Sequence, residues 1–477
     1  MLAASTAALA LHAAAAGRTL GVRFVPVRSH WVQALMHASL FAGWAPFFPG
    51  VVEHLPHFAA QLLFYYGFEL VLAWSRRDLA RTGFGALPIL GSTNLFLWFR
   101  DDWFVLQFAM LATGALAKEF LLWERDGRRT HVFNPSSFPL FLACAALWAG
   151  SGDGLTWASE IAVSQEQVPH GLLGIFLLGL VVQSLFAVTL VTLGAVVALF
   201  AANQVFTALT GVYVWTDVGI PVAVYLGCHF LITDPATSPR TARGRLLFGL
   251  LYGLAVCGLY IVLRLADGPA HYDKLLCVPF LNLLVRRLDG LGGTPPSAMA
   301  NRIHVALAVI LFASFHGTRF FGDDHPGDDI ALWERACARS VWVACESHAS
   351  LVDQACHASD WPSCERYAVL SIEGRGVERD LADALYHRTL ACQQGVADAC
   401  EGVEALRRDG GDAALEEACE GGAGLSCMVL GTLLHGSMDG PADPAASRHW
   451  LRRSCELGVA EACEFLGSDR AGPTPER

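Results

Sequence analysis

The amino-acid sequence predicts an all-α protein. A polytopic membrane bundle of about ten or eleven helices, built as two pseudo-repeated halves, precedes a repeat domain of disulfide-stapled α-hairpins. Hydrophobic residues make up 54% of the 477 residues and charged residues only 16%, whereas soluble domains carry about 25% charged residues. Apolar stretches recur along the first 320 residues, and ten of the 14 cysteines, all after these stretches, form five pairs, each with its two cysteines eight residues apart.

The charge divides the chain near residue 320. Residues 1–320 hold 20 Lys and Arg against 16 Asp and Glu, a net charge of +4, while residues 321–477 hold 13 Arg against 28 acidic residues, a net charge of −15. Neither part shows a basic stripe with interleaved aromatic residues, so no nucleic-acid partner is expected. We expect an N-terminal leader at 1–29, a transmembrane domain at 30–319, an acidic linker at 320–334, a cysteine-rich helical repeat domain at 335–468 and a tail at 469–477.

The membrane spans are predicted from length. A hydrocarbon core about 30 Å thick requires roughly 20 mostly apolar residues per helix. Such stretches lie near 30–51, 56–74, 84–99, 103–123, 132–149, 171–191, 193–213, 218–234, 246–264, 272–285 and 303–318. The first 16 residues are small and apolar but lack the basic start of a signal peptide, so the leader is expected to be weakly ordered or interfacial.

Loop charge predicts the orientation in the lipid bilayer, because Lys and Arg are retained on the cytoplasmic side. With the N-terminus inside, fifteen basic residues lie in cytoplasmic segments and only Arg100, Arg264 and Lys274 in the opposite loops. An odd number of spans then places the acidic part outside the cytoplasm. The sequence therefore predicts a multi-pass inner-membrane protein with an extracytoplasmic C-terminal domain.

The cysteines of that domain are paired by spacing. Two intervals between pairs are both 36 residues, a period typical of stacked helical hairpins. Cysteines at the end of one helix and the start of its antiparallel successor can approach the ~4.4–6.8 Å between Cα atoms that a disulfide requires. Zinc knuckles use a Cys-x2-Cys spacing instead, so no metal site is expected. The predicted disulfides, each with cysteines eight residues apart, are Cys337 with Cys345, Cys356 with Cys364, Cys392 with Cys400, Cys419 with Cys427 and Cys455 with Cys463.

Disulfides persist in oxidising compartments. They therefore predict an extracytoplasmic location for this domain, in agreement with the loop charge. Over about residues 335–467 it resembles the cysteine-rich SEL-like repeats, which are relatives of the tetratricopeptide repeat. The matching stretches are 373–377 with 382–386, and 445–451 with the motif at Cys455. The resemblance implies a protein-binding surface, and the charge of −15 indicates a basic or cationic partner. The alternative is a stapled cap without a partner.

Ionisable residues inside the predicted spans are costly in lipid and mark function by default. Glu69 lies late in the second span, and Lys118 and Glu119 lie late in the fourth. Neighbouring residues point about 100° apart on a helix, so Lys118 cannot simply pair with Glu119, and Glu69 is its candidate partner. The alternative role is snorkelling to the interface with structural helix pairing.

Two proline breaks organise the predicted bundle. Asn134 precedes a proline where a span opens, shortly after His131, and Asp234 precedes another where a span closes, between His229 and Thr237. Asn or Asp before a helical proline can cap exposed backbone donors. The two breaks are about 100 residues apart, as corresponding elements of two repeated halves are. Backbone N–H groups left free at such helix ends suit an anionic or polar ligand.

At these residues the chain resembles the RnfD/NqrB family, the membrane subunits of ion-coupled, flavin-containing electron-transport complexes, over about residues 30–290. The resemblance is carried by Ala117-Lys118, Phe133-Asn134-Pro135, Thr233-Asp234-Pro235-Ala236-Thr237-Ser238-Pro239, Arg243-Gly244-Arg245 and the closing element at 277–283. It implies flavin-linked electron transfer or coupled ion transport, with other membrane or redox subunits as partners. It also implies a non-covalent FMN or riboflavin beside Asn134, Asp234, Thr237, His131 and His229.

One departure concerns the flavin. Family members with covalent FMN carry a Ser-Gly-Ala-Thr element in an outer loop, whereas the corresponding loop here reads Gly-Ser-Gly-Asp-Gly-Leu-Thr at 150–156. We therefore expect no covalent FMN. The alternatives are a flavin-free transporter or channel-like protein and a membrane-anchored scaffold that recruits partners through its repeats. No catalytic residue is identified, and at most the chain is a redox subunit of a membrane oxidoreductase complex.

Overall fold

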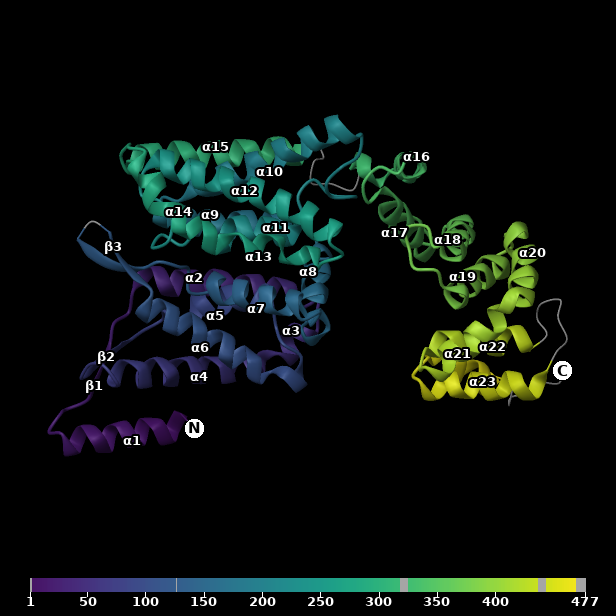
Figure 1. The fold of residues 1–477 in the computed structure, drawn as a ribbon, viewed down its shortest axis with the longest axis horizontal. Coiled ribbons are helices and arrows are strands. Elements are labelled where there is room, and N and C mark those ends of the chain that lie inside the picture. Colours follow the sequence, from purple (N-terminus) through teal and green to yellow (C-terminus); the bar gives the residue numbers. More distant parts are fainter. Residues whose placement is uncertain (1, 126, 318–324, 436–442, 469–477) are drawn as a thin grey trace, which may run out of the picture. The chain divides into compact units, whose positions relative to one another are not determined.

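The computed structural model describes residues 2–125, 127–317, 325–435 and 443–468 (Figure 1). The predicted tail and the first part of the predicted linker lie outside these residues. The chain divides into two compact units, residues 1–209 with 213–325, and residues 326–477 with 210–212. Both are built almost entirely of helices, which confirms the predicted all-α class.

The first half of the membrane unit contains the proline break at Asn134. The predicted leader is partly regular, since it contains a helix and a strand. The elements are α1 Leu2–Ala15, β1 Gly21–Phe24, α2 Arg28–Trp44, α3 Gly50–Glu53, α4 Leu55–Trp74, β2 Leu79–Thr82, α5 Ala86–Asn94, the 3-10 helix η1 Asp101–Trp103, α6 Val105–Phe120, β3 Leu122–Arg125, β4 Arg128–His131 and α7 Ser137–Ala149.

The second half contains the break at Asp234. A π-helix, η3, follows α11 directly, so the predicted span at 218–234 is not one regular helix. The elements are η2 Asp153–Leu155, α8 Ala158–Glu166, α9 Gly171–Phe186, α10 Thr189–Thr210, α11 Val222–Leu226, η3 Gly227–Leu231, α12 Ala242–Leu265, η4 Ala270–Tyr272, α13 Asp273–Leu276, α14 Val278–Gly290 and α15 Ala298–Gly317.

Helices long and apolar enough to cross a bilayer are fewer than the predicted ten or eleven. Among the described residues, α10, α12 and the Ala298–Phe315 part of α15 qualify, and α8 with α9, bent by 101°, is a candidate fourth span. The other predicted spans contain shorter, broken or less apolar helices. Pro279, for example, lies in the first turn of α14 and divides the predicted span at 272–285, because proline has no N–H for a continuing helix.

Two short β-ribbons, which the sequence analysis did not predict, lie in the basic segments of the membrane unit. β1 pairs with β2 in parallel, and β3 pairs with β4 as an antiparallel hairpin in which Leu122 faces His131. His131 was expected at the start of a helix, but it lies on a strand. Pro135 explains the difference, because a residue before proline is disfavoured in the α conformation, and α7 begins only at Ser137.

The apolar core of the membrane unit includes the four cysteines outside the repeats. Cys144, Cys228, Cys257 and Cys277 are free and buried, and all four belong to one hydrophobic cluster that also contains Tyr252. Small thiols of this kind pack as apolar side chains.

The second unit is a row of helical hairpins. The elements are η5 Pro326–Asp328, α16 Ile330–Ala338, α17 Ala344–His357, α18 Trp361–Glu373, α19 Leu381–Gln393, α20 Ala397–Leu406, the π-helix η6 Arg407–Gly411, α21 Asp412–Glu420, α22 Gly424–Leu434, α23 Pro444–Glu456 and α24 Ala460–Ser468.

Five disulfides fasten these hairpins, and each joins the end of one helix to the start of the next. Their Cα–Cα distances are 4.5 to 4.9 Å, and α17 carries cysteines of two bridges. Every predicted pair is confirmed. The bonded cysteines are Cys337 with Cys345, Cys356 with Cys364, Cys392 with Cys400, Cys419 with Cys427 and Cys455 with Cys463.

Candidate functional site

The two proline breaks, about 100 residues apart in the sequence, meet in the membrane unit. The side-chain amide of Asn134 donates to the carbonyl of Leu231 at 2.8 Å. Asn282 on α14 joins both breaks, because its Oδ1 accepts from the backbone N–H of Asn134 at 3.1 Å and its Nδ2 donates to the carbonyl of Thr237 at 3.3 Å. We call this contact the junction. The sequence analysis cited Asn282 only within the closing motif and gave it no role.

Asn134 also performs the predicted cap. Its Oδ1 accepts hydrogen bonds from the backbone N–H groups of Ser136 and Ser137, at 2.9 and 3.3 Å, and from the Ser136 hydroxyl at 2.8 Å. The side chain is therefore bonded at both ends within the chain, and the residue is 4% exposed. A buried amide with these partners fixes the start of α7.

Asp234 lies in the same region and faces His131. The distance from its Oδ2 to Nε2 of His131 is 3.6 Å, and Thr237 donates its hydroxyl to the same carboxylate oxygen at 2.7 Å. The backbone N–H of Ala236 donates to the other oxygen at 3.2 Å. The structure therefore brings four of the five predicted cofactor residues together. A carboxylate facing an imidazole can hold a proton, a cation or a polar ligand.

His229, the fifth predicted residue, has different surroundings on the π-helix η3. Its Nδ1 lies 3.0 Å from the carbonyl of Tyr225, and a methyl group placed on Gly179 would lie 2.6 Å from the His229 ring. The ring lines a narrow cavity with Gln183 and Thr192. Its backbone carbonyl accepts the hydroxyl of Thr233, the residue before Asp234, at 2.7 Å.

His37 on α2 repeats this arrangement. Its Nδ1 lies 2.7 Å from the carbonyl of Gln33, and Gly91 packs against its ring. His37 borders an apolar cavity of about 420 Å³, which His54 and Trp98 also line. The sequence analysis gave His37 no role, because a single histidine in an apolar stretch carries no signal for a partner.

Arg125 ties the β3–β4 hairpin to the second break. Its guanidinium donates to the carbonyl of Ser238 at 2.9 Å and to Oδ2 of Asp289 at 2.6 Å. The other oxygen of Asp289 accepts from the backbone N–H groups of Arg240 and Thr241. In the sequence Arg125 counts only as one of the basic residues of a loop, and no pattern predicts this clamp.

The predicted intramembrane ionisable residues form two separate groups. Lys118 donates to Oε1 of Glu69 at 3.0 Å, which is the pairing expected from the sequence. Glu119 faces elsewhere and binds Arg76 and Arg77 at 3.3 and 2.8 Å. Pairing lowers the cost of a charge near lipid, so both groups fit the ends of helices α4 and α6.

The loop at 150–156 turns its threonine inward. Thr156 is 2% exposed, and its hydroxyl donates to the carbonyl of Asp153 at 3.2 Å. The carboxylate of Asp153 lies 3.3 Å from His271 and accepts the Tyr272 hydroxyl at 2.7 Å. The contact with His271 holds the pKa of Asp153 below its usual value, against the effect of burial.

Comparison with known proteins supports part of the resemblance. The D subunit of the ion-translocating oxidoreductase complex of Tolumonas auensis is 45% identical over 71 residues, which are 14% of this chain and 18% of that protein. Its counterpart in Actinobacillus succinogenes is 37% identical over 73 residues, 15% of this chain and 21% of that protein. The chain thus spans about a fifth of the length of these curated relatives. No protein-family profile matches the sequence.

Among solved structures, a Sel1 repeat protein from Oxalobacter formigenes aligns with 52% of this chain and 85% of its own, at 15% identity and a TM-score of 0.13. The protective antigen c5321 of uropathogenic Escherichia coli, which has an SLR fold, covers 58% of this chain and 68% of its own, at 14% identity and a TM-score of 0.17. The repeat architecture is shown by the helical hairpins and disulfides described above.

Proposed function

We propose that this chain is a membrane subunit related to RnfD/NqrB, which takes part in flavin-linked electron transfer or coupled ion transport. The observation that carries the proposal is the junction. Asn134 and Asp234 belong to the two motifs of the resemblance, and they lie in loops that Asn282 joins by hydrogen bonds to both. The partial identity to the D subunits of ion-translocating complexes supports the same function.

A buried polar atom next to the junction lacks a hydrogen-bond partner, and a polar ligand could supply one. Nε2 of His131 is buried without a hydrogen-bond partner, and such a buried group usually signals a missing partner. A hydroxylated or phosphorylated flavin side chain would supply it. His131, Asp234 and Thr237 would then hold a non-covalent FMN or riboflavin, which would provide the electron-transfer chemistry.

Covalent attachment is not part of the proposal. The only threonine in the loop at 150–156 is Thr156, whose hydroxyl is buried and bonded within its own turn. A phosphoester to that oxygen would require this loop to open. For ion movement, Glu69 and Lys118 are the proposed candidates, because they form an ionisable pair within the predicted spans.

The repeat domain is proposed to lie on the extracytoplasmic side of an inner membrane and to bind a protein. Its five disulfides favour an oxidising compartment. Residues 321–477 carry a net charge of −15, which favours a basic partner.

A second candidate function is a flavin-free transporter or membrane-anchored scaffold with the same fold. One observation favours it: both ends of the Asn134 side chain already have partners within the chain. In this case the junction would be a structural lock and would bind no cofactor.

Flavin content separates the two functions. The protein would be purified in mild detergent, and flavin would be measured by visible absorbance and, after denaturation, by fluorescence of the released supernatant and of the protein band in a gel. We expect released flavin, a dark band, and loss of flavin in Asp234→Ala and Asn134→Ala. His304→Gln on α15 is the matched control and should keep it.

Purified protein without flavin would reject the electron-transfer proposal and favour the second candidate. Flavin that remains in both Asp234→Ala and Asn134→Ala would place the cofactor elsewhere in the chain. A fluorescent band at full length would contradict non-covalent binding.

A further inference from the structure

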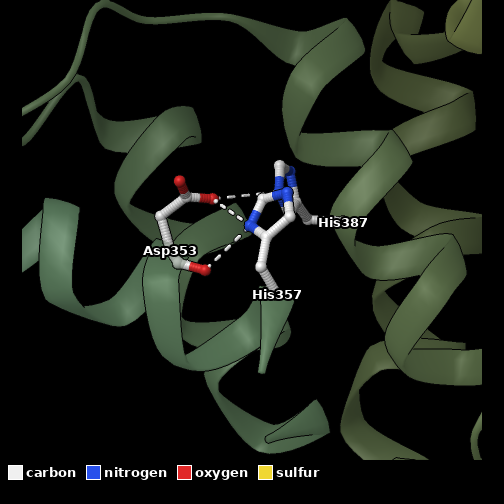
Figure 2. A group of neighbouring side chains, drawn as sticks. All are labelled: Asp353, His357 and His387. Atoms are coloured by element: carbon white, nitrogen blue, oxygen red, sulfur yellow. Dashed lines mark hydrogen bonds and ion pairs between the residues drawn. The ribbon is translucent and has the colours of Figure 1, made fainter. Parts of the chain in front are cut away.

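Three side chains of the repeat domain converge between two helices that are not neighbours in sequence (Figure 2). Asp353 and His357 lie one turn apart at the end of α17, and His387 reaches them from α19. Nδ1 of His357 lies 3.2 Å and Nε2 of His387 lies 3.5 Å from the same oxygen of Asp353. One ligand atom from each residue lies within 4.8 Å of the others.

The orientation of His387 is set by its other nitrogen. Nδ1 lies 2.9 Å from the carbonyl of Asp383 and 3.2 Å from its carboxylate, so this nitrogen carries the proton. The ring contacts Tyr367 and Tyr386, with centroid distances of 4.5 and 4.9 Å. These contacts hold Nε2 of His387 toward Asp353.

That Nε2 atom is buried and has no hydrogen-bond partner in the structure, and the His387 side chain is only 5% exposed. In the neutral imidazole, whose proton is on Nδ1, Nε2 presents a lone pair to a carboxylate oxygen, and two acceptors face each other. At 3.5 Å the contact is also longer than the ~2.7–3.2 Å of a protein hydrogen bond. A cation between the two atoms would satisfy both.

The spacing fits a tetrahedral metal ion. Zinc binds His nitrogen at about 2.0–2.1 Å and carboxylate oxygen at about 2.0–2.2 Å, so ligand atoms around a tetrahedral ion lie roughly 3.4 Å apart. The 3.5 Å between Nε2 of His387 and the Asp353 oxygen agrees with this value. Nδ1 of His357 lies 2.9 Å from the backbone carbonyl of Asp353 and carries its proton there. Because the His357 side chain is 64% exposed, its ring can turn to present its other nitrogen to the ion, and a water molecule can occupy the fourth position.

The surroundings have the supporting shell that metal sites require. Asp383 bonds the far nitrogen of His387, and Ser371 donates its hydroxyl to Asp383 at 3.0 Å. Metal-bound histidines almost always donate their second nitrogen in this way. The cysteines, which the sequence analysis considered as metal ligands, are consumed in disulfides, so the site depends on His and Asp alone.

We propose that Asp353, His357 and His387 bind one Zn²⁺ ion, which braces α17 against α19. Two imidazoles and one carboxylate are ligands that suit this ion. Disulfides fasten α17 to α18 and α19 to α20, but none joins α18 to α19. By joining α17 to α19, the metal ion stabilises the part of the repeat domain where α18 and α19 lack a disulfide. The site is independent of the junction and of flavin binding.

Metal binding to the full-length protein tests the site. Protein without a polyhistidine tag would be stripped with a chelator, loaded with excess Zn²⁺ and desalted, and its zinc content measured by mass spectrometry. Affinity would be measured by competition with a chromophoric chelator. We expect one zinc per chain, and at least about tenfold weaker binding in Asp353→Asn, His357→Gln and the supporting variant Asp383→Asn.

His449→Gln on α23, which removes another exposed histidine of the repeat domain, is the matched control and should bind zinc as the unaltered chain does. His357 is exposed, so its substitution leaves the helix core intact, and circular dichroism checks the fold of every variant. Co²⁺ should give the absorption bands of a tetrahedral nitrogen and oxygen site. Less than one zinc per chain after loading, or equal affinity in His357→Gln and His449→Gln, would overturn the proposal.

Discussion

The contact between helices α10 and α12 depends on glycine and gives a sharp test of the membrane unit. A methyl group on Gly249 would overlap the carbonyl oxygen of Val191 and would lie 2.9 Å from the backbone nitrogen of Ala195. One turn later, a methyl group on Gly253 would meet the carbonyl of Ala195 and would lie 2.8 Å from Cβ of Ala198. Small residues four apart allow helix backbones to approach closely in membranes.

The magnitude follows from these contacts. Carbon atoms pack best at about 3.5–4.0 Å, so the helices would have to separate by roughly 1 Å, which forfeits a quarter to a half of the dispersion energy along the contact. The groups that a methyl would overlap at Gly249 are backbone, which no rotamer change can move. Overpacking of this kind costs about 1–3 kcal/mol. At roughly 2–4 °C per kcal/mol, Gly249→Ala should lower the apparent Tm by about 2–12 °C.

The assay is a thermal melt of the detergent-solubilised chain with a fluorogenic thiol dye. The dye reports unfolding because the four free cysteines are buried in the membrane unit. Gly258→Ala on the same helix is the matched control, since a methyl group there would have nothing within 4 Å. Equal melting temperatures for Gly249→Ala and Gly258→Ala would refute the close contact.

Three further variants test other parts of the chain. Replacing Cys392 and Cys400 by Ser should destabilise the repeat domain by about 2.5 kcal/mol, the loop entropy of an eight-residue closure; unchanged denaturant unfolding of the oxidised protein would contradict this. Lys118→Met should lower the Tm of the membrane unit because Glu69 loses its partner, and adding Glu69→Gln should restore part of the loss. If the Tm change of the double variant equals the sum of the changes of the two single variants, the two side chains do not interact. Asn282→Ala should cost about 1–3 kcal/mol by leaving two buried backbone groups unpaired, and a Tm equal to that of the unaltered chain would show that the junction contributes no stability.

Some of the candidate site could be predicted because its signals are local. Asn134 and Asp234 each precede a proline, and a polar residue before proline marks a helix end whatever surrounds it. Glu69 was a candidate partner for Lys118 because both were placed near the same end of their spans, and the two are paired. Asn282 and Arg125 were not assigned roles, because each acts on segments 45 to 164 residues away.

The breaks in the helices could not be predicted from the sequence either. A window of apolar residues predicts burial or lipid contact, but it does not show whether the backbone continues as one helix. Residues 218–234 were predicted as one span, yet the structure divides them at a π-helix where His229 packs on Gly179. The fit of that ring against a glycine of another helix decides the local geometry.

By itself, the sequence determined the division into an apolar and an acidic body and the pairing of ten cysteines. Both depend on composition or on contacts within one hairpin, where a separation of eight residues leaves a cysteine few alternatives. Only the tertiary structure decided what lies between helices. Asp353 and His387 are 34 residues apart with a whole helix between them, and no spacing rule links them. They meet because packing of α17, α18 and α19 places one buried nitrogen opposite one carboxylate.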